Sequence, residues 1–125
     1  MIAVDTSTLV DFFAGKKGDD IDQLREGFRL GIIILPPIVL SEILSDPQLP
    51  AEIEDRILKL PSLEIKPGFW ERVGKLRRIL FKKKLKPKLA DTLIAQFCLD
   101  HSLPLLTRDK DFQNFQRFGS LVIKI

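Results

Sequence analysis

The amino-acid sequence predicts an α/β fold in which helices cover both faces of a mainly parallel β-sheet. Two patterns carry this prediction. Short apolar runs at residues 2–5, 32–35 and 105–107 lack the alternation of polar and apolar residues that a half-exposed sheet shows. Segments with apolar residues at helical spacing separate these runs. With 125 residues and 45% hydrophobic content, residues 1–125 are expected to form a single domain.

The first half of the chain is expected to alternate strands with helices. Residues 6–8 are Thr, Ser and Thr, which are good N-cap types and favour a helix directly after the first apolar run. Gly31 suits the left-handed end of a second helix, and Pro37 suits the start of a third. The predicted elements are a strand at 2–5, a helix to 14, a helix from 19 or 20 to 30, a strand at 32–35, and helices at 38–45 and 51–60.

The second half is expected to continue this alternation. A long amphipathic segment places Phe69, Val73, Leu76 and Leu80 on one helix face. Pro87 suits the start of the helix that follows. The predicted elements are a strand at 63–65, helices at 68–84 and 87–101, a strand at 105–107, one or two helical turns at 110–118, and a strand at 121–125.

Composition and charge favour a cytoplasmic protein with anionic partners. The net charge of +3 is a mild bias towards such partners. Cys98 is the only cysteine, so we expect neither an intramolecular disulfide nor a cysteine-based zinc site. The opening residues 1–5 lack the basic start of a secretory signal, and the longest apolar stretch, residues 30–40, is shorter than the roughly 20 residues of a membrane helix. We therefore expect a cytoplasmic location and no membrane association.

Four acidic residues lie at strand ends or in the first turns of predicted helices. Asp5 ends the first strand and Asp109 follows the strand at 105–107, while Glu42 lies in the helix after the strand at 32–35 and Asp91 lies near the start of its helix. In an open α/β sheet, ligands bind beyond the carboxyl ends of the strands, where loops and helix N-termini converge. The topology therefore predicts that these four acids lie at one edge of the sheet, with Asp111 nearby.

Such a group of acids predicts a metal site. Grouped carboxylates repel one another, which raises some of their pKa values unless a cation neutralises them. Their oxygens suit Mg²⁺ or Mn²⁺, and these ions can activate water for phosphodiester hydrolysis without a histidine or a cysteine. Taken singly, each acid also has a structural explanation as a helix cap or a solvated charge. The prediction that Asp5, Glu42, Asp91 and Asp109 are metal ligands and catalytic residues therefore rests on the set.

Three more residues bear on this site. Glu42 has apolar neighbours in its helix, where a buried acid would need a partner. Ser7 and Thr107 are predicted auxiliary residues that orient Asp5 and Asp109 or bind metal-bound water. A helix cap and a strand-end hydroxyl are equally good explanations for these two.

A basic run leads into the helix that carries Asp91. Lys84, Lys86 and Lys88 are predicted to hold the phosphate backbone of RNA, and Arg108, beside Asp109, is included in this set. A solvated helix face is the alternative for the run.

Four short motifs occur in an order and spacing typical of a known family: Asp5-Thr6-Ser7, Ser41-Glu42-Ile43-Leu44, Asp91-Thr92-Leu93-Ile94-Ala95 and Thr107-Arg108-Asp109-Lys110-Asp111-Phe112. Through them the chain resembles the PIN-domain nucleases, and more narrowly their VapC-type toxins, over nearly its whole length. The resemblance implies a three-layer α/β/α sandwich with a mainly parallel central sheet. It also implies endonucleolytic cleavage of RNA that depends on Mg²⁺ or Mn²⁺.

The same resemblance implies roles and partners. Metal binding is expected from Asp5 and Asp91, with Glu42 and Asp109 completing the acidic pocket and Asp111 as an auxiliary acid. The expected partners are an RNA substrate, a second copy in a homodimer, and a cognate antitoxin protein that occupies the site. The predicted function is therefore the endoribonuclease toxin of a toxin-antitoxin pair.

Two other functions agree less well with the sequence. A non-catalytic RNA- or protein-binding module on the same scaffold would tolerate loss of any one acid, whereas all the motif acids are present. A receiver-type phosphotransfer domain would need paired acids after the first strand, and Asp5 stands alone there. The nuclease is therefore the preferred prediction.

Overall fold

The centre of the structure, a computed structural model that describes residues 1–124, is a parallel β-sheet. Its strands are β1 (Ile2–Val4), β2 (Ile33–Ile34), β3 (Leu105–Leu106) and β4 (Ile123–Lys124). They lie in the order β2-β1-β3-β4, and each neighbouring pair is parallel. Ala3 pairs with Ile34 on one side and with Leu105 on the other, so β1 lies inside the sheet.

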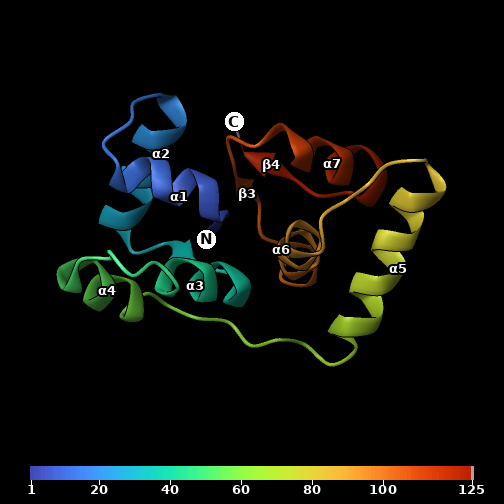
Figure 1. Ribbon diagram of the computed structural model, residues 1–125, viewed down its shortest axis with the longest axis horizontal. Coiled ribbons are helices and arrows are strands. Elements are labelled where there is room, and N and C mark those ends of the chain that lie inside the picture. The colour runs from blue at the N-terminus through green and yellow to red at the C-terminus, as the bar shows by residue number, and fades with distance from the viewer. Residues whose placement is uncertain (125) are drawn as a thin grey trace.

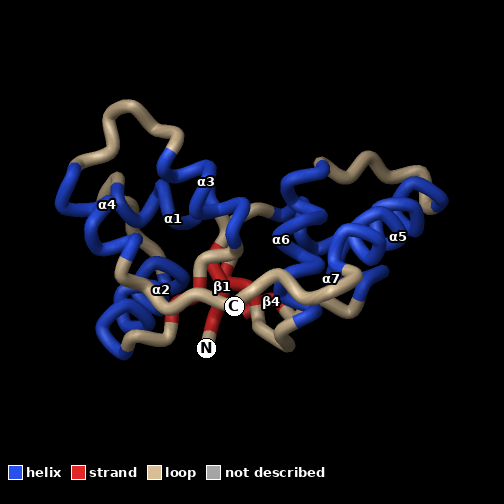
Figure 2. Tube along the Cα trace, turned by 90° about the horizontal axis from the view of Figure 1, so that it is seen from below, coloured by secondary structure: helices blue, strands red, loops and turns tan. Residues whose placement is uncertain are grey.

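Helices connect the strands and gather on two sides of the sheet. They are α1 (Thr6–Phe13), α2 (Asp19–Leu30), α3 (Pro37–Leu44), α4 (Ala51–Leu58), α5 (Phe69–Lys82), α6 (Leu89–Asp100), the short 3₁₀ helix η1 (Lys110–Phe112) and α7 (Gln113–Gly119). Helices α1 to α4 lie to one side of the strands and α5 to α7 to the other (Figure 1). The view turned by 90° shows the same division, with β1 and β4 between the two groups (Figure 2). The three-layer α/β/α prediction is confirmed.

Local sequence signals account for several helix ends. Asp5 caps α1, and its carboxylate accepts a hydrogen bond from the backbone N–H of Thr8 at 3.3 Å. Gly31 ends α2 with φ +68°, a left-handed conformation that costs glycine little. Pro37 occupies the first turn of α3, where no intrahelical donor is needed.

The hydrophobic core forms where the helices pack on the strands. Ala3 and Val4 are completely buried, as are the residues of β2 and β3. The predicted apolar face of α5 is confirmed, because Phe69, Val73, Leu76 and Leu80 are all buried. Burial on both faces explains why the strands lack polar alternation.

The strand predicted at residues 63–65 is wrong. This segment lies in the extended connection that runs from α4 to α5, at a distance from the strands (Figure 1). One backbone group of the segment has a side-chain partner, because the Nε2–H of His101 donates to the carbonyl oxygen of Glu64 at 2.8 Å. Leu63 and Ile65 are only half-buried, and short apolar runs occur in such connections as well as in strands, so the sequence pattern did not separate the two.

The other differences in the fold concern element ends. Helix α5 ends at Lys82 instead of residue 84, and Lys84 turns the chain with φ +62°. The predicted last strand is shorter within the described residues, and Ile125 lies outside them. Over residues 1–124, no helix is long and apolar enough to cross a membrane.

Candidate functional site

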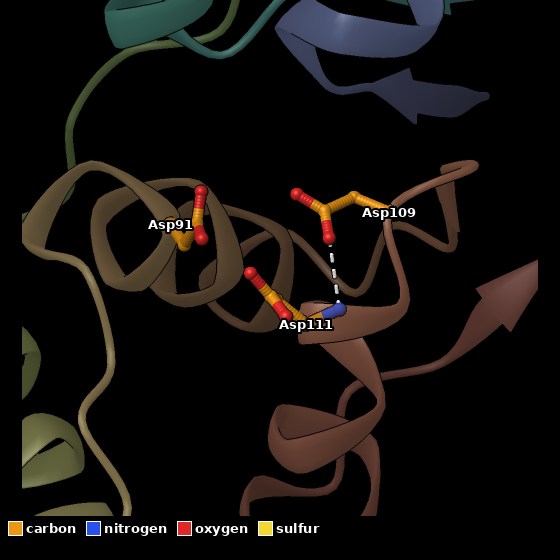
Figure 3. Close-up of side chains that lie close together, drawn as sticks. All are labelled: Asp91, Asp109 and Asp111. Carbon is orange, nitrogen blue, oxygen red and sulfur yellow. Dashed lines mark hydrogen bonds between the residues drawn. The ribbon is translucent and has the colours of Figure 1, made fainter.

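Three carboxylates converge at the carboxyl end of β3. Asp91 comes from the first turn of α6, and Asp109 and Asp111 come from the segment that follows β3 (Figure 3). One oxygen of each lies within 4.8 Å of the others. We refer to Asp91, Asp109 and Asp111 as the acid trio. The structure thus brings together two predicted site acids and the predicted auxiliary acid.

The local turn explains how two of the trio come to be neighbours. Asp109 caps η1, and its carboxylate accepts a hydrogen bond from the backbone N–H of Asp111 at 2.9 Å. This bond, drawn in Figure 3, fixes the two side chains on one short turn. An aspartate that caps a turn in this way leaves its second oxygen free to bind a ligand.

Asp5 lies deeper than the trio and is connected to it through a hydroxyl group. Its side chain is 2% exposed and accepts hydrogen bonds from the hydroxyls of Ser7 and Thr107, each at 2.9 Å. The Thr107 hydroxyl also accepts the backbone N–H of Asp109 at 3.0 Å. Ser7 and Thr107 thus both hold the Asp5 carboxylate, and their role as auxiliary residues of the site stays a prediction. Asp5 itself is not among the acids whose oxygens meet within 4.8 Å.

The environment of these acids makes their ionised forms less stable. The pKa of Asp91 is raised to about 6, mainly by burial and then by the charges of Asp109, Asp111 and Asp5, while Lys88 opposes the rise. Burial also raises the pKa of Asp5, although hydrogen bonds from Thr8, Thr107 and Ser7 counter the effect. A bound cation would offset the cost of burying these charged carboxylates and the repulsion between them, so the donor set fits a hard divalent metal ion.

Glu42 does not join the acid trio. It is exposed on α3, and its carboxylate accepts a hydrogen bond from the hydroxyl of Thr6 at 2.7 Å. Its apolar neighbours do not bury it, because α3 turns Val39 and Ile43 to the core and Glu42 to solvent. The bond to Thr6 nevertheless holds Glu42 beside the residue that follows Asp5.

Two of the predicted RNA-binding lysines line the site. Lys86 and Lys88 border a cavity of about 100 Å³ together with Asp91, Asp111 and Asn114. Lys84 lies one step further away, in a neighbouring hollow that shares Lys86 and Lys88. Asn114 was not predicted. Its position three residues after Asp111, on the same side of a helical turn, is a signal that could have identified it.

Arg108, which was predicted to contact RNA, is bonded to other groups of the chain. Its guanidinium contacts the carboxylates of Asp11 at 3.3 Å and Asp20 at 2.6 Å, and it donates to the carbonyl of Lys17 at 2.7 Å. Its own backbone N–H donates to the buried hydroxyl of Thr8 at 2.9 Å. Arg108 therefore ties the loop after β3 to the α1–α2 connection, and its charge is balanced there. Its intramolecular ion pairs make it less available to an RNA phosphate than Lys86 and Lys88.

A comparison with protein-family models places this geometry in a family. The model described as "PIN domain" matches residues 2–117. The chain belongs to the PIN domain family. This match covers most of the chain and all four acidic motifs, and it excludes the receiver-type alternative.

Solved structures give the same picture of the fold of this PIN domain. A chain in the crystal structure of VapBC2 from Rickettsia felis, bound to a DNA fragment from its promoter, is similar with a TM-score of 0.72. The two share 21% sequence identity over 99% of this PIN domain and 98% of that chain. A search of curated proteins found no significant match. The shared architecture extends to both ends of the molecule.

Proposed function

We propose that this PIN domain is a metal-dependent endoribonuclease. The observation that carries the proposal is the acid trio, with carboxylate oxygens within 4.8 Å, beside a cavity that Lys86 and Lys88 line. Negative groups for a cation and positive groups for a phosphate backbone thus border one small space. Phosphodiester hydrolysis needs both.

The trio is the proposed holder of Mg²⁺ or Mn²⁺. Asp91, Asp109 and Asp111 supply the hard oxygen ligands that these ions prefer. Asp5 and Glu42 remain predicted as further acids of the pocket. Thr107 donates a hydrogen bond to Asp5, and Thr6 donates one to Glu42. When bound, the cation supplies an activated water and positive charge beside the phosphate.

The residues of the chain contribute positioning and charge. Thr107 holds Asp5 with its hydroxyl hydrogen and the backbone of Asp109 with its oxygen, which fixes the two acids relative to each other. Lys86 and Lys88 attract the RNA backbone towards the trio. Asn114 offers an amide that can donate to a phosphate oxygen at the same cavity.

We further propose that the enzyme is the toxin of a toxin-antitoxin pair. The similar solved structure is described as VapBC2 bound to DNA from its promoter, and its fold covers this chain almost completely. The proposed partners are a cognate antitoxin and a second copy in a homodimer, in the cytoplasm. Light scattering of the purified chain, alone and with a candidate antitoxin, measures both associations.

The nuclease proposal is tested by incubating a panel of RNAs with Mg²⁺, Mn²⁺ or EDTA. Asp91→Asn and Asp109→Asn should lose most of the cleavage. Asp55→Asn is the matched control, because Asp55 is an exposed acid of α4 outside the trio. Cleavage that survives EDTA, or that both trio variants retain, would overturn the mechanism. Binding of RNA without any cleavage would favour a non-catalytic module.

A further inference from the structure

An exposed aromatic side chain lies at the end of helix α5, within a basic hollow. Phe81 is 48% exposed, although phenylalanine is usually buried. The hollow around it is lined by Arg77, Phe81, Lys84, Leu85, Lys86, Pro87 and Lys88. An apolar ring surrounded by cations suits a ligand that combines a flat apolar surface with negative charge.

The ring is supported from one side by a fixed cation. The guanidinium of Arg77 lies over Phe81, 5.0 Å from the ring centroid. The same guanidinium donates to the backbone carbonyl of Pro87 at 3.1 Å, which limits its movement. Phe81 remains 48% exposed beside this cation. The two side chains form a platform that is ordered before any ligand arrives, which lowers the entropic cost of binding.

The hollow at the platform borders the cavity at the acid trio. The hollow around Phe81 and the cavity beside the trio share Lys86, Pro87 and Lys88. A strand with one phosphate at the trio would pass these two lysines before it reaches Phe81. Across these two hollows, the acid trio is thus followed by Lys86 and Lys88 and then by the ring of Phe81.

We propose that Phe81, backed by Arg77, is a stacking subsite for an unpaired nucleobase of the RNA whose backbone lies at the acid trio. The proposal rests on the ribonuclease function. Nucleobases stack on aromatic rings regardless of sequence, and larger purines bury more surface than pyrimidines. Phe81 therefore favours single-stranded segments and a purine at this position. A base that is paired within a duplex has no face free for the ring.

A second exposed aromatic residue shows why charge decides the occupant. Trp70 lies at the other end of α5 and is 66% exposed, next to a hollow of about 210 Å³. No lysine or arginine lines that hollow. An RNA strand would find no counter-charge there, whereas cations surround Phe81. Trp70 thus provides a matched control on the same helix.

Binding of fluorescein-labelled RNA 10-mers in EDTA tests the proposal without cleavage. The probes are oligo(A), oligo(U), and an oligo(A) duplexed with oligo(U). Phe81→Leu should weaken oligo(A) binding roughly tenfold and oligo(U) binding less, since a stacked base contributes about 1–3 kcal/mol. Phe81→Tyr should retain the affinity, and Trp70→Leu should leave it unchanged. The duplex should show no dependence on Phe81.

The possible results separate this proposal from the nuclease proposal. Equal oligo(A) binding by Phe81→Leu and the wild type would overturn the stacking subsite, even if the wild type cleaves RNA. An equal loss in Trp70→Leu, or an equal loss with the duplex, would also overturn it. A wild type that binds oligo(A) through Phe81 but cleaves no RNA in Mg²⁺ would support the subsite and contradict the nuclease.

Discussion

Asp5 and Asp109, which come from opposite ends of the chain, are joined by a single hydroxyl group. Thr107 donates to the Asp5 carboxylate at 2.9 Å and accepts from the Asp109 backbone N–H at 3.0 Å. The hydroxyl thus uses both its donor and one of its acceptor positions. Because Asp5 is buried beside β1 and Asp109 caps η1, this bridge sets the position of the acid trio relative to the sheet.

Thr107→Val tests the two hydrogen bonds of the Thr107 hydroxyl with little change in side-chain volume. Valine has nearly the volume of threonine but forms neither hydrogen bond, so the buried Asp5 carboxylate loses one of its donors. We expect the free energy of unfolding to fall by about 1–3 kcal/mol in urea, and RNA cleavage to fall as Asp109 loosens. Thr107→Ser keeps both hydrogen bonds and should retain most of the cleavage. A Thr107→Val variant as stable and active as the wild type would show that the bridge is dispensable.

The raised pKa of Asp91 predicts an unusual pH dependence of stability. The pKa is about 6 in the folded chain against an ordinary value of 3.8, so the folded state binds more protons between these values. Without divalent cations, the contribution of Asp91 to stability is complete below about pH 4 and is lost as pH rises through about 6. Urea unfolding of the wild type and of Asp91→Asn from pH 4 to pH 7 measures it.

The difference between the two curves isolates Asp91. Other acids have their own slopes, as at Asp100, where burial raises the pKa but hydrogen bonds from Arg72 and Gln96 bring it below its ordinary value. Contributions from acids that do not interact with Asp91, such as Asp100, are common to the wild type and the variant and cancel, so the difference reports Asp91 together with its repulsion from neighbouring acids. Stability of the wild type that does not fall relative to Asp91→Asn between pH 4 and pH 6 would contradict the burial of charge at the trio.

The order of the elements explains why Asp91 and Asp109 lie together, but it says less about the surroundings of the acids. Asp109 follows β3, and Asp91 lies at the start of α6, the helix that leads into β3, so both lie at the carboxyl edge of the sheet. The exposure of Glu42 could not be predicted this way, since the rotation of α3 depends on how it packs against α1 and α6. Asp111 was ranked as auxiliary, but the η1 turn brings it into the trio.

Partners that are distant in sequence explain the remaining differences. Arg108 was expected to be free for RNA because its neighbours Asp109 and Asp111 form a site. Its actual partners, Asp11 and Asp20, lie about 90 residues earlier in the chain and were outside any local pattern. The strand predicted at residues 63–65 failed for a related reason. A strand needs a neighbouring strand to pair with, and the local apolar pattern carries no information about such a partner.

Mg²⁺ should stabilise the protein in a manner that depends on the trio. A cation that binds only the folded state raises the melting temperature, and it competes with the proton that Asp91 holds below its pKa of about 6. We therefore expect a larger rise at pH 7.5 than at pH 5. Asp111→Asn should weaken Mg²⁺ binding by more than about tenfold, because ligand charge sets affinity at carboxylate sites.

Glu42→Gln is the comparison for this measurement. Glu42 is exposed and bonded to Thr6, away from the acids that meet within 4.8 Å. Its neutralisation should weaken Mg²⁺ binding less than that of Asp111. A larger effect at Glu42 than at Asp111 would place the cation nearer to α3 than the trio indicates.

Lys88 and Arg108 should differ in what they control. Lys88 lines the cavity beside the trio, so Lys88→Gln should weaken RNA binding and reduce the slope of log affinity against log salt by about 0.7, the value for one phosphate contact on a single strand. The free energy of unfolding of Lys88→Gln should stay within about 0.5 kcal/mol of the wild-type value.

Arg108→Gln removes ion pairs to Asp11 and Asp20 and should lower stability by about 1 kcal/mol with the salt slope unchanged. Titrations of one RNA 10-mer at several KCl concentrations, with urea unfolding of each variant, measure both properties. If Arg108→Gln lowers the salt slope as much as Lys88→Gln does, then Arg108 contacts RNA despite its two carboxylate partners.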